Sequence, residues 1–152
     1  MKRRALLKAA LCTPLLELAP AASNAQTPPQ GRVFGSDAGM ILNTIKPDKA
    51  ADFENVVDKV RLALQASSDP IRKQQAEGWE VFKAVEPGAN NTVLYVFWIS
   101  PAVKGADYTI SKILYEAFPN EVQDLYKKFS ESYGGGQTLV NLHLLSNMGR
   151  RA

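Results

Sequence analysis

Asparagine and histidine side chains stand inside two otherwise apolar segments of this sequence. Asn43 lies within MILNTIK, and Asn141 and His143 lie within TLVNLHLLS. An amide and a neutral imidazole each offer a hydrogen-bond donor and an acceptor, so they could hold the hydroxyl or carbonyl group of a small molecule. His143 is the only histidine of the chain, and the last strand has no carboxylate beside it. These residues therefore indicate hydrogen bonding, and we expect no metal site.

The alternation of side chains along a strand relates these polar residues to one another. Successive side chains of a strand point to opposite faces, so Asn43 shares a face with Ile41 and Ile45. Asn141 and His143 share a face opposite a wholly apolar set, which suits packing against helices. We therefore expect Asn43, Asn141 and His143 together on the face without helices. Two roles stay open: they bond one another, backbone or water at a seam between chains, or they face a ligand.

The elements that would position these residues are predicted from periodicity and from helix-start and helix-stop residues. Asp48, Asp69 before Pro70, and Asp107 are predicted N-caps. The first helical region is expected to end at Gly78 and the second, interrupted at Pro119, at the glycine run 134–136. Strands are expected over 40–46, 79–86, 92–100 and 138–146.

The resulting order is strand, helix, strand, strand, helix, strand. This is the split βαβ pattern of a ferredoxin-like α+β fold, with a four-stranded antiparallel sheet. Right-handed crossovers place both helical regions on one face. The segment VLYVFWIS, residues 93–100, is apolar on both faces of its strand, so the face without helices stays uncovered and apolar. We therefore expect a homodimer formed through that face, with Trp98 as a flat side chain beside a ligand.

This order of elements, the opening ILNTIKPDKAADF and the apolar third strand with Trp98 resemble the dimeric α/β barrel superfamily. That superfamily includes domains similar to antibiotic-biosynthesis monooxygenases and haem-degrading monooxygenases. The resemblance covers about residues 39–146. It implies two sheets packed face to face around a shared pocket.

The resemblance does not extend to haem chemistry. Haem-degrading members use an asparagine on the first strand, a tryptophan, and a histidine on the second helix. Asn43 matches the first of these, but Trp98 lies on the third strand, and residues 110–133 contain no histidine. Without an axial imidazole we expect no haem, and no other cofactor.

The N-terminus has the order of a secretory signal peptide. A basic start is followed by an apolar stretch and by small residues before Gln26. This arrangement predicts cleavage after residue 25 and export to the periplasm. The two arginines at positions 3 and 4 also fit a twin-arginine signal, so both the Sec and the twin-arginine routes stay open. We interpret residues 26–38 as a flexible tether, 39–146 as the ferredoxin-like domain and 147–152 as a frayed tail.

Removing residues 1–25 changes the chemistry of the chain. Four of the 18 basic residues and one of the 15 acidic residues lie there, so the charges of the remaining chain balance. A balanced, mixed surface disfavours nucleic acid as a partner. The only cysteine, Cys12, is also removed, which excludes disulfides and thiol chemistry from the mature chain. We expect no membrane anchor in it either.

Two functions follow from this sequence. The first is an exported dimer of unassigned activity that binds a small apolar or aromatic molecule in the barrel pocket. The alternative is a cofactor-independent monooxygenase or isomerase of the same fold. Asn43, Trp98, Asn141 and His143 are the candidate ligand-binding residues in either case, and the residues do not decide whether the chain is an enzyme.

Overall fold

The computed structural model describes residues 31–149 of the 152-residue chain. The predicted signal peptide, residues 1–25, lies outside the described residues. The elements follow in the order β1 Ala38–Ile45, α1 Ala50–Ala66, α2 Pro70–Gly78, β2 Trp79–Lys83, β3 Val93–Ile99, α3 Ile110–Ala117, α4 Val122–Ser132 and β4 Tyr133–Leu142.

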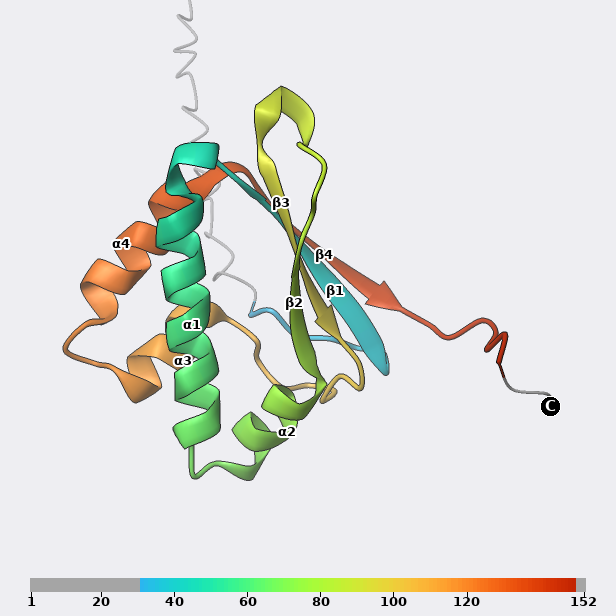
Figure 1. The fold of residues 1–152 in the computed structure, drawn as a ribbon. Coiled ribbons are helices and arrows are strands. Elements are labelled where there is room, and N and C mark those ends of the chain that lie inside the picture. The colour runs from blue at the N-terminus through green and yellow to red at the C-terminus, as the bar shows by residue number, and fades with distance from the viewer. Residues whose placement is uncertain (1–30, 150–152) are drawn as a thin grey trace, which may run out of the picture.

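The four strands form one antiparallel sheet in the order β2-β3-β1-β4. All four helices lie on the same side of this sheet (Figure 1). The structure confirms the predicted element order and an α+β fold compatible with the ferredoxin-like topology. Each predicted helical region consists of two helices, α1 with α2 and α3 with α4.

The two faces of the sheet differ in burial. In β3, Tyr95, Phe97 and Ile99 are buried, whereas the side chains between them are only half-buried. The alternation in β1 is the same, with Ile41 and Ile45 buried. The buried set therefore faces the helices.

The core is centred on an aromatic cluster around Phe53 of α1. Its ring centroid lies 4.8 Å from that of Tyr95 and 6.0 Å from those of Phe97 and Phe129. Tyr133, at the start of β4, completes the cluster at 6.1 Å. These contacts connect α1 to α4, to the inner strand β3 and to the edge strand β4.

The segment before β1 is part of the packed domain. Phe34 is completely buried, and its ring makes an edge contact with that of Tyr108 at 5.2 Å. Val33 forms an isolated β-bridge with Asp107. The tether predicted over residues 26–38 therefore does not extend through Phe34, because this aromatic ring fills a place in the core.

The predicted helix starts have mixed outcomes. Asp69 caps α2 as expected, accepting a 2.8 Å hydrogen bond from the backbone N–H of Ile71. Asp48 does not cap α1, because it lies in a short 3₁₀ helix, Pro47–Lys49, that precedes it. The side chain of Asp107 accepts hydrogen bonds from Thr109, and α3 begins only at Ile110.

The glycine run 134–136 is the main local departure from the sequence prediction. We expected it to stop the helix and turn the chain, but β4 begins at Tyr133 and includes all three glycines. The pairing of β4 with β1 shifts register between Thr44 and Ile45, which marks a bulge. A Cβ on Gly135 would lie 3.1 Å from the Thr44 side chain, so glycine suits this close approach. The last strand also ends at Leu142, earlier than predicted.

Candidate functional site

Asn43 lies on the helix-covered face of the sheet, so our prediction that it occupies the open face is wrong. Its side chain is completely buried. Its Nδ2 donates hydrogen bonds to the backbone carbonyls of Ile41 at 3.1 Å and Tyr95 at 3.3 Å. Its Oδ1 accepts from the Tyr133 hydroxyl at 3.0 Å and from Gln137 Nε2 at 2.8 Å. These four bonds explain how a polar side chain is tolerated in the core.

The network around Asn43 reaches the protein surface through Gln137 and Arg32. Gln137 Nε2 also donates to the Tyr133 hydroxyl oxygen at 2.7 Å, and Gln137 Oε1 accepts from Arg32 Nη2 at 2.9 Å. Burial raises the pKa of the Tyr133 hydroxyl well above its usual value. The hydroxyl therefore stays protonated at neutral pH and acts as a donor. The side chains of Asn43, Tyr133 and Gln137 bond to one another, and Asn43 also bonds to backbone carbonyls. We therefore assign these three side chains a structural role.

Asn141 and His143 do not join Asn43. The Oδ1 of Asn141 accepts hydrogen bonds from the backbone N–H of Gly35 at 2.9 Å and the hydroxyl of Ser36 at 3.1 Å. His143 follows the end of β4 and is exposed. The predicted three-residue polar group is therefore not formed within residues 31–149. Asn141 pairs with Gly39, so it lies on the helix side of the sheet, and our prediction that it occupies the open face is also wrong; it is separated along β4 from Gln137, the strand partner of Asn43. His143 follows the last residue of β4 and has no strand neighbour.

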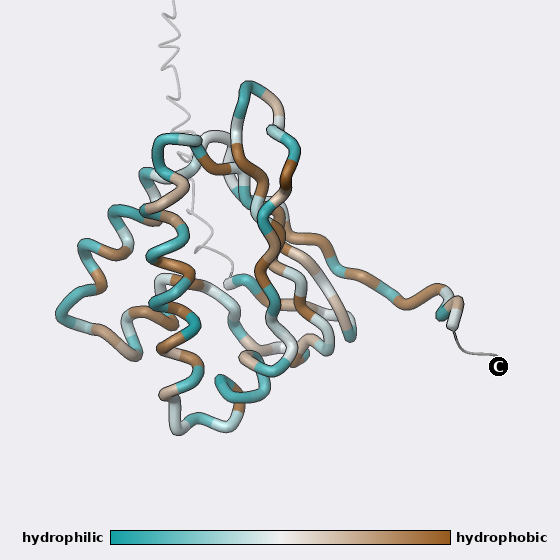
Figure 2. The backbone as a smooth tube through the Cα atoms, in the orientation of Figure 1, coloured by the Kyte–Doolittle hydropathy of each residue, from teal (hydrophilic) through white to brown (hydrophobic). Residues whose placement is uncertain are grey.

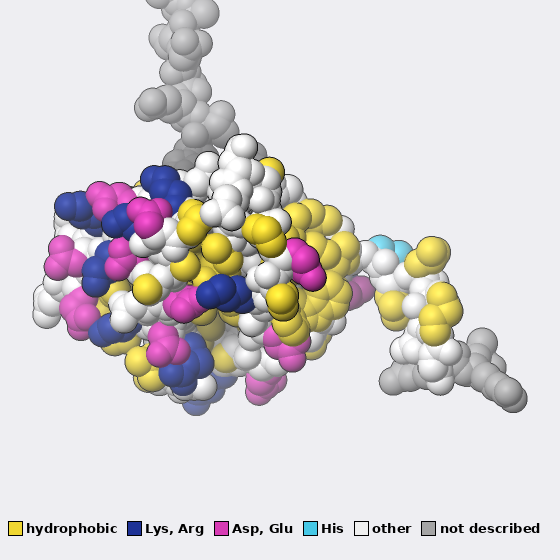
Figure 3. Space-filling view, turned by 45° about the horizontal axis from the view of Figure 1, so that its top comes forward, with side chains coloured by type: hydrophobic (Ala, Val, Ile, Leu, Met, Phe, Trp, Pro, Cys, Tyr) yellow, Lys and Arg dark blue, Asp and Glu magenta, His cyan; other side chains and the backbone are white. Residues whose placement is uncertain are grey.

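Trp98 is the one predicted ligand-binding residue on the open face. It lies among half-buried apolar side chains that share this face, which the strand register identifies. We call this set the open-face patch: Met40, Leu42, Phe82, Leu94, Val96, Trp98, Val140 and Leu142. Phe82 is 53% exposed. Figure 3 shows hydrophobic side chains gathered over this part of the sheet, and no helix among residues 31–149 covers it.

The chain continues from β4 as an extended segment that projects away from the domain (Figure 1). We call residues 143–148 the C-terminal arm. Its Leu144, Leu145 and Met148 are 75%, 97% and 94% exposed. Figure 2 shows hydrophobic stretches along this arm as well as along the strands. A second apolar surface therefore lies next to the open-face patch.

The helix side of the sheet has a hollow at the β2 edge. A pocket of about 210 Å³ lies between α1, α2 and the strands β2 and β3. Its lining includes Trp79, whose ring packs against those of Phe97 and Tyr108 at centroid distances of 5.5 and 5.4 Å. The indole nitrogen of Trp79 is buried and has no hydrogen-bond partner among the described residues. An unpaired buried donor of this kind costs about 1–3 kcal/mol.

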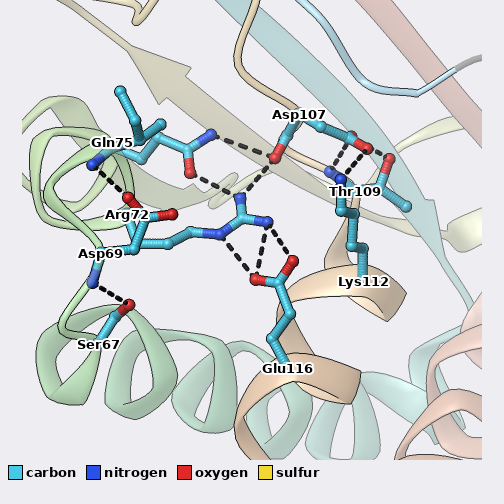
Figure 4. Close-up of polar contacts among 9 residues, drawn as sticks. Ser67, Asp69, Arg72, Gln75, Asp107, Thr109, Lys112 and Glu116 are labelled. Atoms are coloured by element: carbon cyan, nitrogen blue, oxygen red, sulfur yellow. Dashed lines mark hydrogen bonds and ion pairs between the residues drawn. The ribbon is translucent and has the colours of Figure 1, made fainter.

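A second hollow, of about 310 Å³, lies between α1 and α3 and includes Arg72 and Glu116 in its lining. Figure 4 shows the guanidinium group of Arg72 enclosed by acceptors from three segments. Its Nε and Nη2 bond both carboxylate oxygens of Glu116 at 2.9 and 3.0 Å. Its Nη1 donates to Gln75 Oε1 and to the carbonyl of Asp107, each at 2.7 Å. Arg72 is therefore already neutralised, and the cluster joins α2 to α3.

Within the part of the chain that the structure describes, no helix is long and apolar enough to cross a bilayer. No group of three or more histidine, cysteine, aspartate or glutamate side chains there is placed to hold a metal ion.

No family model, curated protein or solved structure matches this chain. The candidate sites are therefore argued from the geometry alone. Of the four residues predicted to bind a ligand, the structure places Trp98 in an apolar surface and gives Asn43 and Asn141 intramolecular partners.

Sequence reasoning missed the residues that enclose Asn43 and those that line the β2-edge pocket. Tyr133 and Gln137 are 90 and 94 positions from Asn43, so no local pattern connects them. Arg72 and Glu116 are 44 positions apart and present the same difficulty. Trp79 directly follows the predicted helix stop at Gly78, and its aromatic ring at an element junction was the only available signal.

Proposed function

We propose that this chain is an exported protein that forms a homodimer of the dimeric α/β barrel type. In this arrangement the sheets of two chains pack face to face and enclose a small apolar or aromatic molecule. The observation that carries the proposal is the open-face patch, a continuous apolar surface with Trp98 in it. Export is supported by the order of basic, apolar and small residues before Gln26.

A second copy of the chain is the occupant that fits this surface best. A closed two-fold interface uses the same patch twice, so an apolar face is complementary to itself. The open-face patch and the C-terminal arm together offer on the order of 900 Å² of apolar surface per chain, about what one partner contributes to a stable interface. The net charge of the chain after the signal is near zero, so no strong like-charge repulsion opposes association.

The arm adds a reason to choose a second copy over an unrelated partner. Its three apolar residues project beyond the chain's own sheet. In a two-fold symmetric dimer each arm extends toward the other chain. Formation of the one interface therefore buries both arms. Trp98 is the largest side chain of the patch and provides the flat surface against which an aromatic ligand stacks.

Binding can be tested with 1-naphthol as the probe, using isothermal titration calorimetry on the purified protein. We expect saturable binding to the dimer that weakens by at least about tenfold in Trp98→Ala, because the stacking surface is removed. Tyr126→Ala is the matched control, since it removes an exposed aromatic side chain of α4 on the helix side, and it should bind 1-naphthol like the parent. Equal affinities of 1-naphthol for the parent and for Trp98→Ala would show that the ligand does not bind at the open face.

A further inference from the structure

The pocket at the β2 edge is separate from the open-face patch because it lies on the other side of the sheet. Val81 points to the helix side, as its register partner Phe97 does, and yet Val81 is 41% exposed. The helix layer therefore does not close over this end of the sheet. The pocket belongs to a single chain and needs no second copy.

The lining of this pocket is apolar inside and polar at one margin. Its apolar members come from two helices, two strands and the start of α3: Val57, Val60, Leu64, Ala76, Trp79, Val81, Phe97 and Ile110. A volume of about 210 Å³ suits one ring, since an apolar cavity of roughly 150 Å³ is enough for benzene. A single-ring molecule is therefore the size of ligand that fits.

The polar margin determines the charge of the ligand. Arg61 donates to Asp58 Oδ1 through Nε and Nη2, each at 3.1 Å, and to Gln65 Oε1 through Nη1 at 3.3 Å. The guanidinium charge is balanced by Asp58, whose carboxylate would repel an incoming anion. A neutral ligand is therefore favoured over a carboxylate.

The ring of Trp79 forms part of the pocket wall, whereas its indole nitrogen is closed off from the pocket. Trp79 is among the lining residues, and its N–H is buried without a partner within residues 31–149. Buried donors in proteins are nearly always paired, so this one calls for an explanation. The nitrogen has essentially no accessible surface, so an atom in the pocket does not reach it, and the unpaired N–H is a cost of packing the indole against Phe97 and Tyr108.

We propose that the β2-edge pocket binds a neutral, single-ring aromatic molecule of the size of a substituted phenol. The ring lies among the apolar side chains beneath α1 and α2, against the ring of Trp79. This site is independent of the proposed dimer and of the ligand proposed between the sheets.

The two tryptophans make the test selective, because the chain has only two indole N–H groups. In ¹⁵N-labelled protein each gives one indole NMR signal, and Trp98→Phe identifies the signal of Trp79. On titration with 4-methylphenol we expect a saturable shift of the Trp79 indole signal, because an aromatic ring bound against the indole changes its magnetic surroundings. The same shift should occur in Trp98→Phe, whose remaining tryptophan is Trp79.

Filling the pocket supplies the control for specific binding. Ala76→Leu places a larger side chain in the lining, and Ala51→Leu makes the same change at an exposed position of α1. We expect Ala76→Leu to weaken binding of 4-methylphenol by at least about tenfold and Ala51→Leu to leave it unchanged. Equal affinities in the two variants, or no saturable shift of the Trp79 signal in the folded protein, would overturn the site. Tighter binding of benzoate than of 4-methylphenol would overturn the ligand class.

Discussion

The two faces of the sheet each carry one tryptophan, and the two side chains lie in different surroundings. Trp79 lies on the helix side among Phe97 and Tyr108, in the aromatic part of the core. Trp98 lies on the open face, where no helix among residues 31–149 covers it. Trp79, on the helix side, therefore contributes to the stability of a single chain. Trp98, on the open face, is available for contact with a second molecule.

The comparison also explains why the polar residues lie where they do. The helix-covered face accommodates Asn43 because strands β1, β3 and β4 provide partners for four hydrogen bonds of its side chain. On the open face the strand register also places Thr44, Glu80 and Thr138 beside the open-face patch, and Glu80 and Thr138 are exposed to solvent. A polar residue in the core thus needs partners from distant segments, whereas an apolar surface needs only another apolar surface.

The largest expected effect is on the helix-covered face. Asn43→Ala removes four hydrogen bonds and leaves the Tyr133 hydroxyl and the Gln137 amide in the core with fewer partners. We expect the free energy of unfolding to fall by about 3 kcal/mol. Urea denaturation measures this change. Asn55→Ala, at an exposed position of α1, is the matched control and should change stability little; a similar loss in both variants would show that the network contributes nothing.

The contact between α2 and α3 gives the next effect. Glu116→Gln removes the charge that balances the buried guanidinium of Arg72, while keeping a side chain of similar shape. Glu116 is itself 44% exposed on its side chain, so water compensates in part, and we expect a loss of about 1–2 kcal/mol. Thermal and urea unfolding measure this loss of stability. Glu77→Gln, at an exposed position of α2, is the matched control and should change the unfolding free energy little. An unchanged unfolding free energy would mean that Gln75 and the Asp107 carbonyl suffice for Arg72.

The pH dependence of stability distinguishes the two faces again. Burial raises the pKa of Tyr133 in the folded protein, so the folded state retains its proton at a pH where the unfolded state has lost it. The stabilising contribution is therefore complete below about pH 10 and declines as the pH rises further, by up to about 1.4 kcal/mol per pH unit. Tyr133→Phe should reduce this slope in urea titrations above pH 10. An identical slope in the variant would contradict a buried, protonated Tyr133.

The smallest expected effect on folding concerns the C-terminal arm. Ending the chain after Leu142 removes residues whose side chains are almost fully exposed within one chain, so the unfolding free energy of the monomer should change by less than about 0.5 kcal/mol. The dimer should dissociate more readily, because buried apolar surface is lost. Sedimentation at several concentrations measures this. A truncated protein with unchanged dimer affinity would exclude the arm from the interface.

The local features of the fold were predictable because their causes are local. The sequence Asp69-Pro70 specifies the start of α2, and the apolar period from Phe53 to Leu64 specifies α1. The glycine run 134–136 misled the prediction, because the same residues that stop helices also permit a bulge at the start of a strand. β4 also ends at Leu142, so His143 lies outside the strand.

The candidate sites were less predictable because they depend on contacts between distant segments. Trp98 on an uncovered apolar strand followed from alternation and from counting the helices available to cover the sheet. The placement of Asn43 did not follow, since its partners Tyr133 and Gln137 come from the other end of the domain. The unpaired indole of Trp79 has no signature in sequence.

The central claim is that the open-face patch is where two copies meet, and light scattering on a pair of matched variants tests it most directly. Leu42→Glu puts a charge in the patch, whereas Leu62→Glu puts the same charge on α1, where Leu62 is already 45% exposed. With folding verified by circular dichroism, we expect twice the single-chain mass for the parent and Leu62→Glu at micromolar concentration, and the single-chain mass for Leu42→Glu. A monomeric parent, or a folded Leu42→Glu protein that remains as dimeric as Leu62→Glu, would contradict the claim.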